Sequence, residues 1–154
     1  MGDKKHSFNI VFTLALLGIF ALSALFVAVL GAQVYGRTAE QMDDNYNART
    51  SLVYITEKIR QCPSKNVSID EVDGKQALVL NQDIDGKKYE SWIFSANGKL
   101  KETTVLKGEE VKPEGGQEIM DLNDFSLTLT GDLMKIVVFD QSGNEDSVII
   151  SIRD

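Results

Sequence analysis

The distribution of apolar residues divides the chain into two parts. Residues 8–32 form a run of 25 residues without a charge, in which only Asn9, Thr13 and Ser23 carry polar side chains. At about 1.5 Å rise per residue, a helix of this length spans roughly 37 Å, more than the hydrocarbon core of a bilayer at about 30 Å. A secretory signal peptide has an apolar core of only about 7–15 residues, although "LGA" at the end of this run would fit its cleavage site. We therefore predict a transmembrane helix over residues 8–32 that stays in the mature protein.

The charges on either side of this segment set its expected orientation. Lys4 and Lys5 lie just before it, whereas Arg37 and Arg49 follow it among acidic residues. Lysine and arginine beside a membrane span favour the cytoplasmic side. We expect residues 1–7 to form a short cytoplasmic tail and the chain after the span to be extracytoplasmic. The predicted location is the cell membrane, with a single pass.

The helical period continues beyond the apolar run, over residues 33–62. Apolar residues recur there at spacings of three and four, and most charged residues fall between them. The recurring positions are Tyr35, Ala39, Met42, Tyr46, Leu52, Val53, Ile55 and Ile59. We predict one amphipathic helix that buries these side chains as a single stripe. Pro63 ends the helix, because proline cannot continue the hydrogen-bond ladder.

From residue 63 to residue 154 the pattern changes to the alternation typical of strands. The expected strands are 66–72, 77–82, 89–95, 99–106, 118–122, 125–131, 133–140 and 146–152. Asp73-Gly74, Asp85-Gly86 and Asn97-Gly98 are pairs that tolerate the positive φ angles of tight hairpins. Residues 107–118 have too little apolar content for a strand and predict a flexible loop that divides the meander. The predicted fold class is α+β, with the long helix packed on an antiparallel β-meander.

This organisation resembles type IV pilins and the pseudopilins of type II secretion. Pilin precursors carry a glycine, an aromatic residue, "TL" and a glutamate at the start of the apolar run, and "VFTLAL" retains Phe12, Thr13 and Leu14. Val11 stands in place of the glycine after which the peptidase cuts, and Leu16 stands in place of the glutamate. Residues 4–62 are also similar to an uncharacterised Gram-positive membrane family of unknown function. The resemblance implies a pilin-like fold without the processing step.

Composition argues against nucleic-acid binding and against catalysis. The residues after the apolar run carry a formal charge of −8, which would repel phosphates, and no basic stripe is present. His6 is the only histidine and is predicted on the cytoplasmic side, so no Ser-His or Cys-His pair can form in the outer domain. "NQDIDG" matches the first half of a calcium-binding EF-hand loop, but Trp92 occupies the position of its bidentate glutamate. We expect a protein that is not an enzyme and has no cofactor or bound metal.

Small residues give the one candidate contact site. Ala24, Ala28, Ala32 and Gly36 recur every four residues, which would allow another helix to approach closely. Cys62, the only cysteine, cannot form an internal disulfide. We predict a pilin-like membrane subunit, in contact with lipid, whose transmembrane and amphipathic helix binds protein partners in or beside a type IV pilus-like or secretion apparatus. The alternative is a membrane-tethered extracytoplasmic module that binds or senses a ligand.

Overall fold

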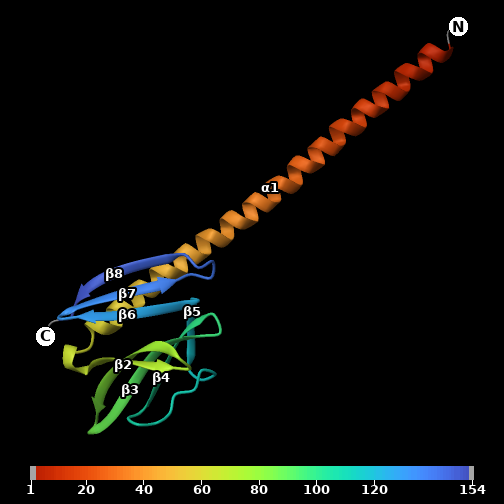
Figure 1. The fold of residues 1–154 in the computed structure, drawn as a ribbon. Helices are drawn as coiled ribbons and strands as arrows, with labels where there is room; N and C mark the ends of the chain where they lie inside the picture. Colours follow the sequence, from red (N-terminus) through yellow and green to blue (C-terminus); the bar gives the residue numbers. More distant parts are fainter. Residues whose placement is uncertain (1–2, 153–154) are drawn as a thin grey trace. The chain divides into compact units, whose positions relative to one another are not determined.

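A computed structural model describes the backbone of residues 3–152 and the side chains of residues 9–152. The chain divides into two compact units, Met1–Gln41 and Met42–Asp154. The predicted cytoplasmic tail, residues 1–7, has no described side chains, and Met1 and Gly2 lie outside the described residues. The first unit is helical in its described residues, and the second contains the end of the helix and eight strands (Figure 1).

The helix α1 extends without a break over Asp3–Arg60, so the apolar and amphipathic segments belong to one helix, which ends two residues before the predicted bound at residue 62. Gln61 and Cys62 form a turn, in which the Cys62 amide donates to the carbonyl of Ile59 at 3.1 Å. Pro63 follows with φ −54° and an extended ψ of 142°. Proline has no amide proton and disfavours helical angles in the preceding residue, which explains the position of the helix end.

The eight predicted strands are all present, preceded by the short 3₁₀ helix η1 (Ser64–Asn66). Their bounds are β1 (Val67–Val72), β2 (Lys75–Ile84), β3 (Lys87–Ala96), β4 (Lys99–Leu106), β5 (Gln117–Asp121), β6 (Asp124–Thr130), β7 (Leu133–Phe139) and β8 (Glu145–Ser151). Every neighbouring pair is antiparallel. Together with α1 they confirm the α+β fold class.

The predicted tight hairpins are confirmed by the backbone angles. Asp73, Asp85 and Asn97 have φ values of 53°, 52° and 54°, and each is followed by a glycine that also has a positive φ. Consecutive positive φ angles match the right-handed twist of the strands on either side, and Asp, Asn and Gly tolerate them best. These turns set the register of β1 to β4.

The strands form two sheets, where the sequence led us to expect one meander divided by the loop at residues 107–118. The first sheet has the order β1-β2-β3-β4-β5 and the second the order β6-β7-β8. The loop does not divide a sheet, because β4 and β5 pair on either side of it. The division lies between β5 and β6: the Leu122 amide donates to the carbonyl of Gly98, and the Asn123 amide donates to that of Phe139. Successive amides thus bond to different sheets.

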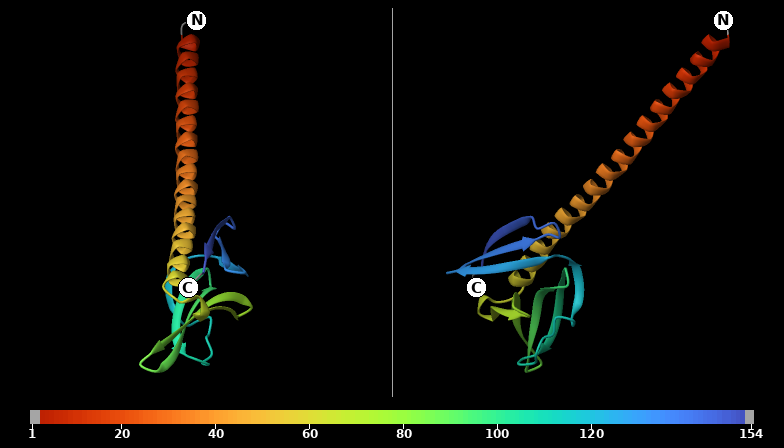
Figure 2. Two further views of the ribbon diagram at one scale, coloured as in Figure 1. Left: turned by 90° about the vertical axis from the view of Figure 1, so that its left-hand side faces the viewer. Right: turned by 45° about the vertical axis from the view of Figure 1, so that its right-hand side comes forward.

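The core lies where the last part of α1 meets both sheets (Figures 1 and 2). Ala48, Leu52, Ile55 and Ile59 are buried and follow one side of the helix. They pack in one cluster with Leu78, Leu80, Ile93, Leu100, Leu122, Phe125, Leu127, Met134, Ile136, Val138 and Ile150. A sheet with one apolar face needs an apolar partner for that face, and this side of α1 supplies it.

The prediction of a single buried helix stripe was wrong, because the amphipathic half of α1 carries one buried apolar stripe and one exposed apolar stripe. Met42, Tyr46 and Val53 have exposed fractions of 68%, 70% and 62%. Each residue turns the helix by about 100°, so Val53 lies about 200° from Ile55, on nearly the opposite side. In the sequence alone, spacings of three and four residues connect the buried positions with the exposed ones, so the two stripes look like one. We call Met42, Tyr46 and Val53 the exposed stripe.

A polar cluster attaches α1 to β4. The Tyr54 hydroxyl and the Lys58 ammonium both donate to the carboxylate of Glu102, the latter at 2.6 Å. The Lys58 nitrogen also lies 5.3 Å from the centre of the Tyr54 ring. Burial, and then the hydrogen bond to Glu102 and the charge of Glu102, raise the pKa of Tyr54 above its ordinary value. The neutral phenol is therefore the form that the folded domain favours.

We expect Tyr54→Phe to lower the free energy of unfolding by about 1–2 kcal/mol at neutral pH, because it removes a hydrogen bond to a charged group. The folded pKa of Tyr54 is raised, so its contribution is complete below the unfolded value of about 10 and falls as pH rises further. The wild-type protein should lose stability above pH of about 10 more steeply than Tyr54→Phe. Urea unfolding of the full chain in micelles at several pH values measures both effects. Tyr46→Phe, on the exposed stripe, is the matched control and should change neither.

Candidate functional site

The first part of α1 has the properties of a membrane span. Among the described residues one helix, over Asn9–Arg60, is long and apolar enough to cross a membrane by length and composition, and none of its most apolar window is buried. The hydroxyls of Thr13 and Ser23 donate to the carbonyls of Asn9 and Phe20, each at 2.8 Å. Such internal bonds suit a segment in lipid, where no water satisfies a polar side chain.

The predicted packing residues Ala24, Ala28, Ala32 and Gly36 all lie in this part of the chain, in α1, and all are exposed. Residues four apart are offset by about 40° around a helix, so the four form a band that winds slowly along one side. No atom beyond its helix neighbours lies within 4 Å of the place that a Cβ at Gly36 would occupy. The described residues therefore bring nothing against this band, and its role in helix packing stays a prediction.

The exposed stripe is the functional feature that the sequence pattern concealed. Met42, Tyr46 and Val53 belong to the second unit, and they lie on the side of α1 that is turned away from the domain core. Large apolar side chains on a surface are common singly, but a row of three along one helix face is typical of a contact with another helix. The sequence does contain a signal of two stripes. Tyr46 and Ala48 are only two residues apart, as are Val53 and Ile55, and residues two apart lie on nearly opposite sides of a helix.

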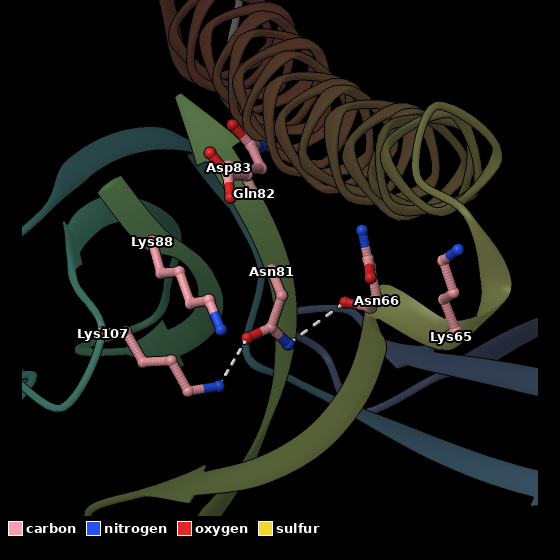
Figure 3. Close-up of a pocket in the computed structure, with 7 residues that line it drawn as sticks. All are labelled: Lys65, Asn66, Asn81, Gln82, Asp83, Lys88 and Lys107. Atoms are coloured by element: carbon pink, nitrogen blue, oxygen red, sulfur yellow. Dashed lines mark hydrogen bonds between the residues drawn. The ribbon is translucent and has the colours of Figure 1, made fainter. Parts of the chain in front are cut away.

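A polar cavity of about 360 Å³ lies at the end of β2 (Figure 3). Its lining residues are Lys65, Asn66, Asn81, Gln82, Asp83, Lys88 and Lys107. Asn81 is fixed at both ends of its side chain, because its amide nitrogen donates to the carbonyl of Asn66 at 3.3 Å and its oxygen accepts from Lys107 at 3.1 Å. The ends of Lys88 and Lys107 point toward Asn81, and Lys65 lies on the far side of Asn66.

The charges around this cavity nearly balance. Lys107 pairs with Glu90 at 3.3 Å, and Lys88 lies directly across the strands from Asp83. The carboxylate of Asp83 also accepts the Gly86 amide at 3.1 Å, which stabilises the hairpin turn. The segment "NQDIDG", which matches the first half of an EF-hand loop, therefore forms the end of β2 and the following turn. No group of three or more His, Cys, Asp or Glu residues that could hold a metal ion is found within residues 9–152.

Cys62 lies beside a neighbouring cavity of about 340 Å³, lined in part by Lys58, Asn81 and Ile84. Its thiol is partly buried and donates to the carbonyl of Asn81 at 3.8 Å. Burial raises the pKa of the Cys62 thiol. The thiolate is the nucleophilic form of cysteine, so this environment lowers the reactivity of Cys62 at neutral pH.

The fold and the apolar helix together define a class: a single-pass membrane protein with a β-rich α+β domain. The model of the family described as "Domain of unknown function (DUF4860)" matches residues 46–141, which is more than half of the chain. The chain belongs to this family. The match extends from the amphipathic half of α1 to just beyond β7, and it lies within the second unit. No curated protein and no solved structure matches the chain.

Cys62 gives a test of the predicted orientation. A membrane-impermeant maleimide should label it on intact, wall-stripped cells, and the rate should rise as pH is raised from 7 to 8.5, because the raised pKa leaves little thiolate at the lower pH. The control is an exposed thiol, Ser147→Cys in a Cys62→Ser background, which should react faster at pH 7. Labelling of both proteins only after permeabilisation would show that the domain lies on the cytoplasmic side.

Proposed function

We propose that this protein is a non-catalytic, pilin-like membrane subunit whose function is to assemble with other membrane-anchored helices, in or beside a type IV pilus-like or secretion apparatus. Its domain lies outside the cytoplasmic membrane, and its partners are lipid and protein. The observation that carries the proposal is the exposed stripe, because it leaves apolar side chains on the same helix that forms the anchor. The acidic domain binds no nucleic acid.

The helix has two kinds of surface for such a contact. In the span, Ala24, Ala28 and Ala32 allow close approach, and association in lipid relies on packing because lipid tails are as apolar as the helices. In the outer segment, Met42, Tyr46 and Val53 are exposed to water, and burying them gains about 25 cal/mol for each Å² removed from water. The pilin glutamate is absent at Leu16, so packing replaces a buried charge as the source of association.

A membrane-tethered binding or sensing module is the second candidate function. The Asn81 cavity favours it, since the Asn81 amide group is held in place by Asn66 and Lys107 within a polar hollow. An assembly ATPase and a polytopic platform protein among the genomic neighbours would favour the subunit, whereas a transporter or kinase would favour the module.

Disulfide crosslinking tests the assembly proposal directly. In a Cys62→Ser background, Tyr46→Cys should form crosslinked dimers or higher species in membranes, whereas Asn45→Cys should form few, because it is exposed but lies about 100° around the helix. Ala28→Ile should then reduce the Tyr46→Cys crosslinks with expression unchanged, since its bulk keeps a neighbouring helix away. Val27→Ile, which adds one methylene, is the control. Equal crosslinking at positions 45 and 46 would refute a contact through the exposed stripe. Crosslinks that survive Ala28→Ile but vanish without the outer domain would make the span a tether only.

The mature N-terminus gives an independent test of the proposal that the apolar run is not cleaved. Because Val11 replaces the glycine of the cleavage site, the intact mass should include the whole apolar run whether or not a prepilin peptidase is expressed. A mass beginning at Phe12 would establish pilin-type cleavage. A mass beginning near Gln33 would identify the apolar run as a signal peptide and contradict the anchor.

A further inference from the structure

Residues 107–116, which connect β4 to β5, form a polar segment that we call the strap. Its sequence, "KGEEVKPEGG", contains three glutamates and two lysines, and Val111 is its one large aliphatic side chain. Gly108 and Gly116 lie near its two ends with φ angles of 94° and 87°. Glycine adopts such angles without steric cost, so both ends of the strap are points where the chain can change direction.

The strap covers a second, smaller apolar cluster, on the face of the first sheet that is turned away from α1. The cluster consists of Val72, Ala77, Phe94 and Ala96, and Trp92 and Val111 pack against it. Phe94 is fully buried. Strand residues two apart share a face, so Trp92 and Phe94 of β3 both lie on the face of the sheet where Val111 packs. Val111 thus supplies the strap's apolar contact with this cluster.

Lys101 is buried beneath the strap without a counter-charge. It lies opposite Phe94 in the register of β3 and β4, and its exposed fraction is only 4%. Its ammonium group donates to the carbonyl of Pro113 in the strap at 3.2 Å, and no carboxylate lies within 4.0 Å of it among the described residues. Glu118, its register partner on β5, is exposed. One neutral acceptor does not offset the free-energy cost of removing a charged ammonium group from water.

Trp92 adds a second unsatisfied donor to the same face. Its indole nitrogen is buried and has no hydrogen-bond acceptor. A buried donor without an acceptor costs about 1–3 kcal/mol relative to the same group in water. With the strap closed, the indole N–H and the spare N–H groups of Lys101 therefore lack partners, and opening the strap would give both access to water.

Few bonds hold the strap closed. Its first residue donates a backbone bond to the carbonyl of Lys88 at 3.0 Å, and the Glu109 amide bonds locally to Leu106. The Lys107 side chain contacts Glu90 and Asn81. The middle of the strap is held by Val111 and by the Lys101 to Pro113 bond. The two sheets do not depend on these contacts, because their ladders and the main core lie elsewhere.

We propose that the strap is a lid that opens locally while both sheets remain folded. Opening exposes an apolar patch made of Trp92, Phe94, Val72 and Ala96. The opposing contributions are of similar size: closure buries Val111 and part of the patch, and it also buries the charge of Lys101 and the N–H of Trp92. A segment with few buried apolar contacts and few hydrogen bonds to the rest of the domain is the kind of element that opens at low free-energy cost.

The experiment follows hydrogen exchange of the Trp92 indole N–H by NMR, with the full chain in detergent micelles. Trp92 is the only tryptophan, so one resonance reports on the strap. Exchange through local opening should change little in low urea, because such opening exposes little surface, whereas exchange through global unfolding rises steeply with urea. We expect the shallow dependence.

Two variants set the direction of the effect. Val111→Ser removes the apolar contact and should accelerate exchange by about fivefold. Lys101→Met keeps the shape of the buried side chain and removes its charge, so it should slow exchange by about fivefold or more. Lys112→Met, an exposed lysine of the strap, should leave the rate unchanged. The proposal is overturned if exchange follows the steep urea dependence of global unfolding, or if Lys101→Met accelerates it as Val111→Ser does.

Discussion

The domain depends on one side of one helix. Ala48, Leu52, Ile55 and Ile59 fill the space between two sheets that share no strand. Each sheet has its own strand ladders, and the two sheets are joined by the common core together with hydrogen bonds such as those from the Leu127 amide to the Gln76 side chain and from the Ser95 hydroxyl to Asp124. Without this helix side, the inner faces of both sheets would lie open to water. The amphipathic half of α1 is therefore part of the domain, which agrees with a family match that begins at Tyr46.

The same constraint decides what remains available for partners. A helix has a limited circumference, and the side that carries Leu52 and Ile55 is fully used within the chain. The polar cluster of Tyr54, Lys58 and Glu102 takes up a further part of the surface. What remains is the arc with Met42, Tyr46 and Val53. An oligomer built through α1 between Met42 and Arg60 has this exposed apolar arc to use.

The local structure of this protein could be read from its sequence, while its long-range arrangement could not. Alternation and Asp-Gly or Asn-Gly pairs located all eight strands and the tight turns, because both depend on near neighbours in the chain. Two apolar stripes looked like one, since periodicity records spacing and not the direction of the core. The division after β5 depends on where the amides of Leu122 and Asn123 find acceptors, which a sequence does not show.

The candidate sites divide in the same way. The small residues from Ala24 to Gly36 and the lone Cys62 could be named from the sequence, because they are defined by residue type and spacing. The buried position of Lys101 could not, since a lysine that shares its strand face with Lys99 and Thr103 is ordinarily exposed. Its burial follows from the strap, in which the Pro113 carbonyl accepts the Lys101 ammonium and Val111 packs on the small apolar cluster.

The three tight turns of the first sheet differ in how much added sequence each could accept. No heavy atom beyond the chain neighbours lies within 4 Å of the Cβ positions at Gly74 and Gly86, so insertions there would extend into open space. The carbonyl of Gly98 accepts bonds from both the Leu122 amide and the Gln141 side chain, the latter at 2.7 Å. That turn joins the start of β4 to the crossover between sheets and to the β7–β8 connection. Length variation among members of the family should accordingly accumulate at the first two turns and avoid the third.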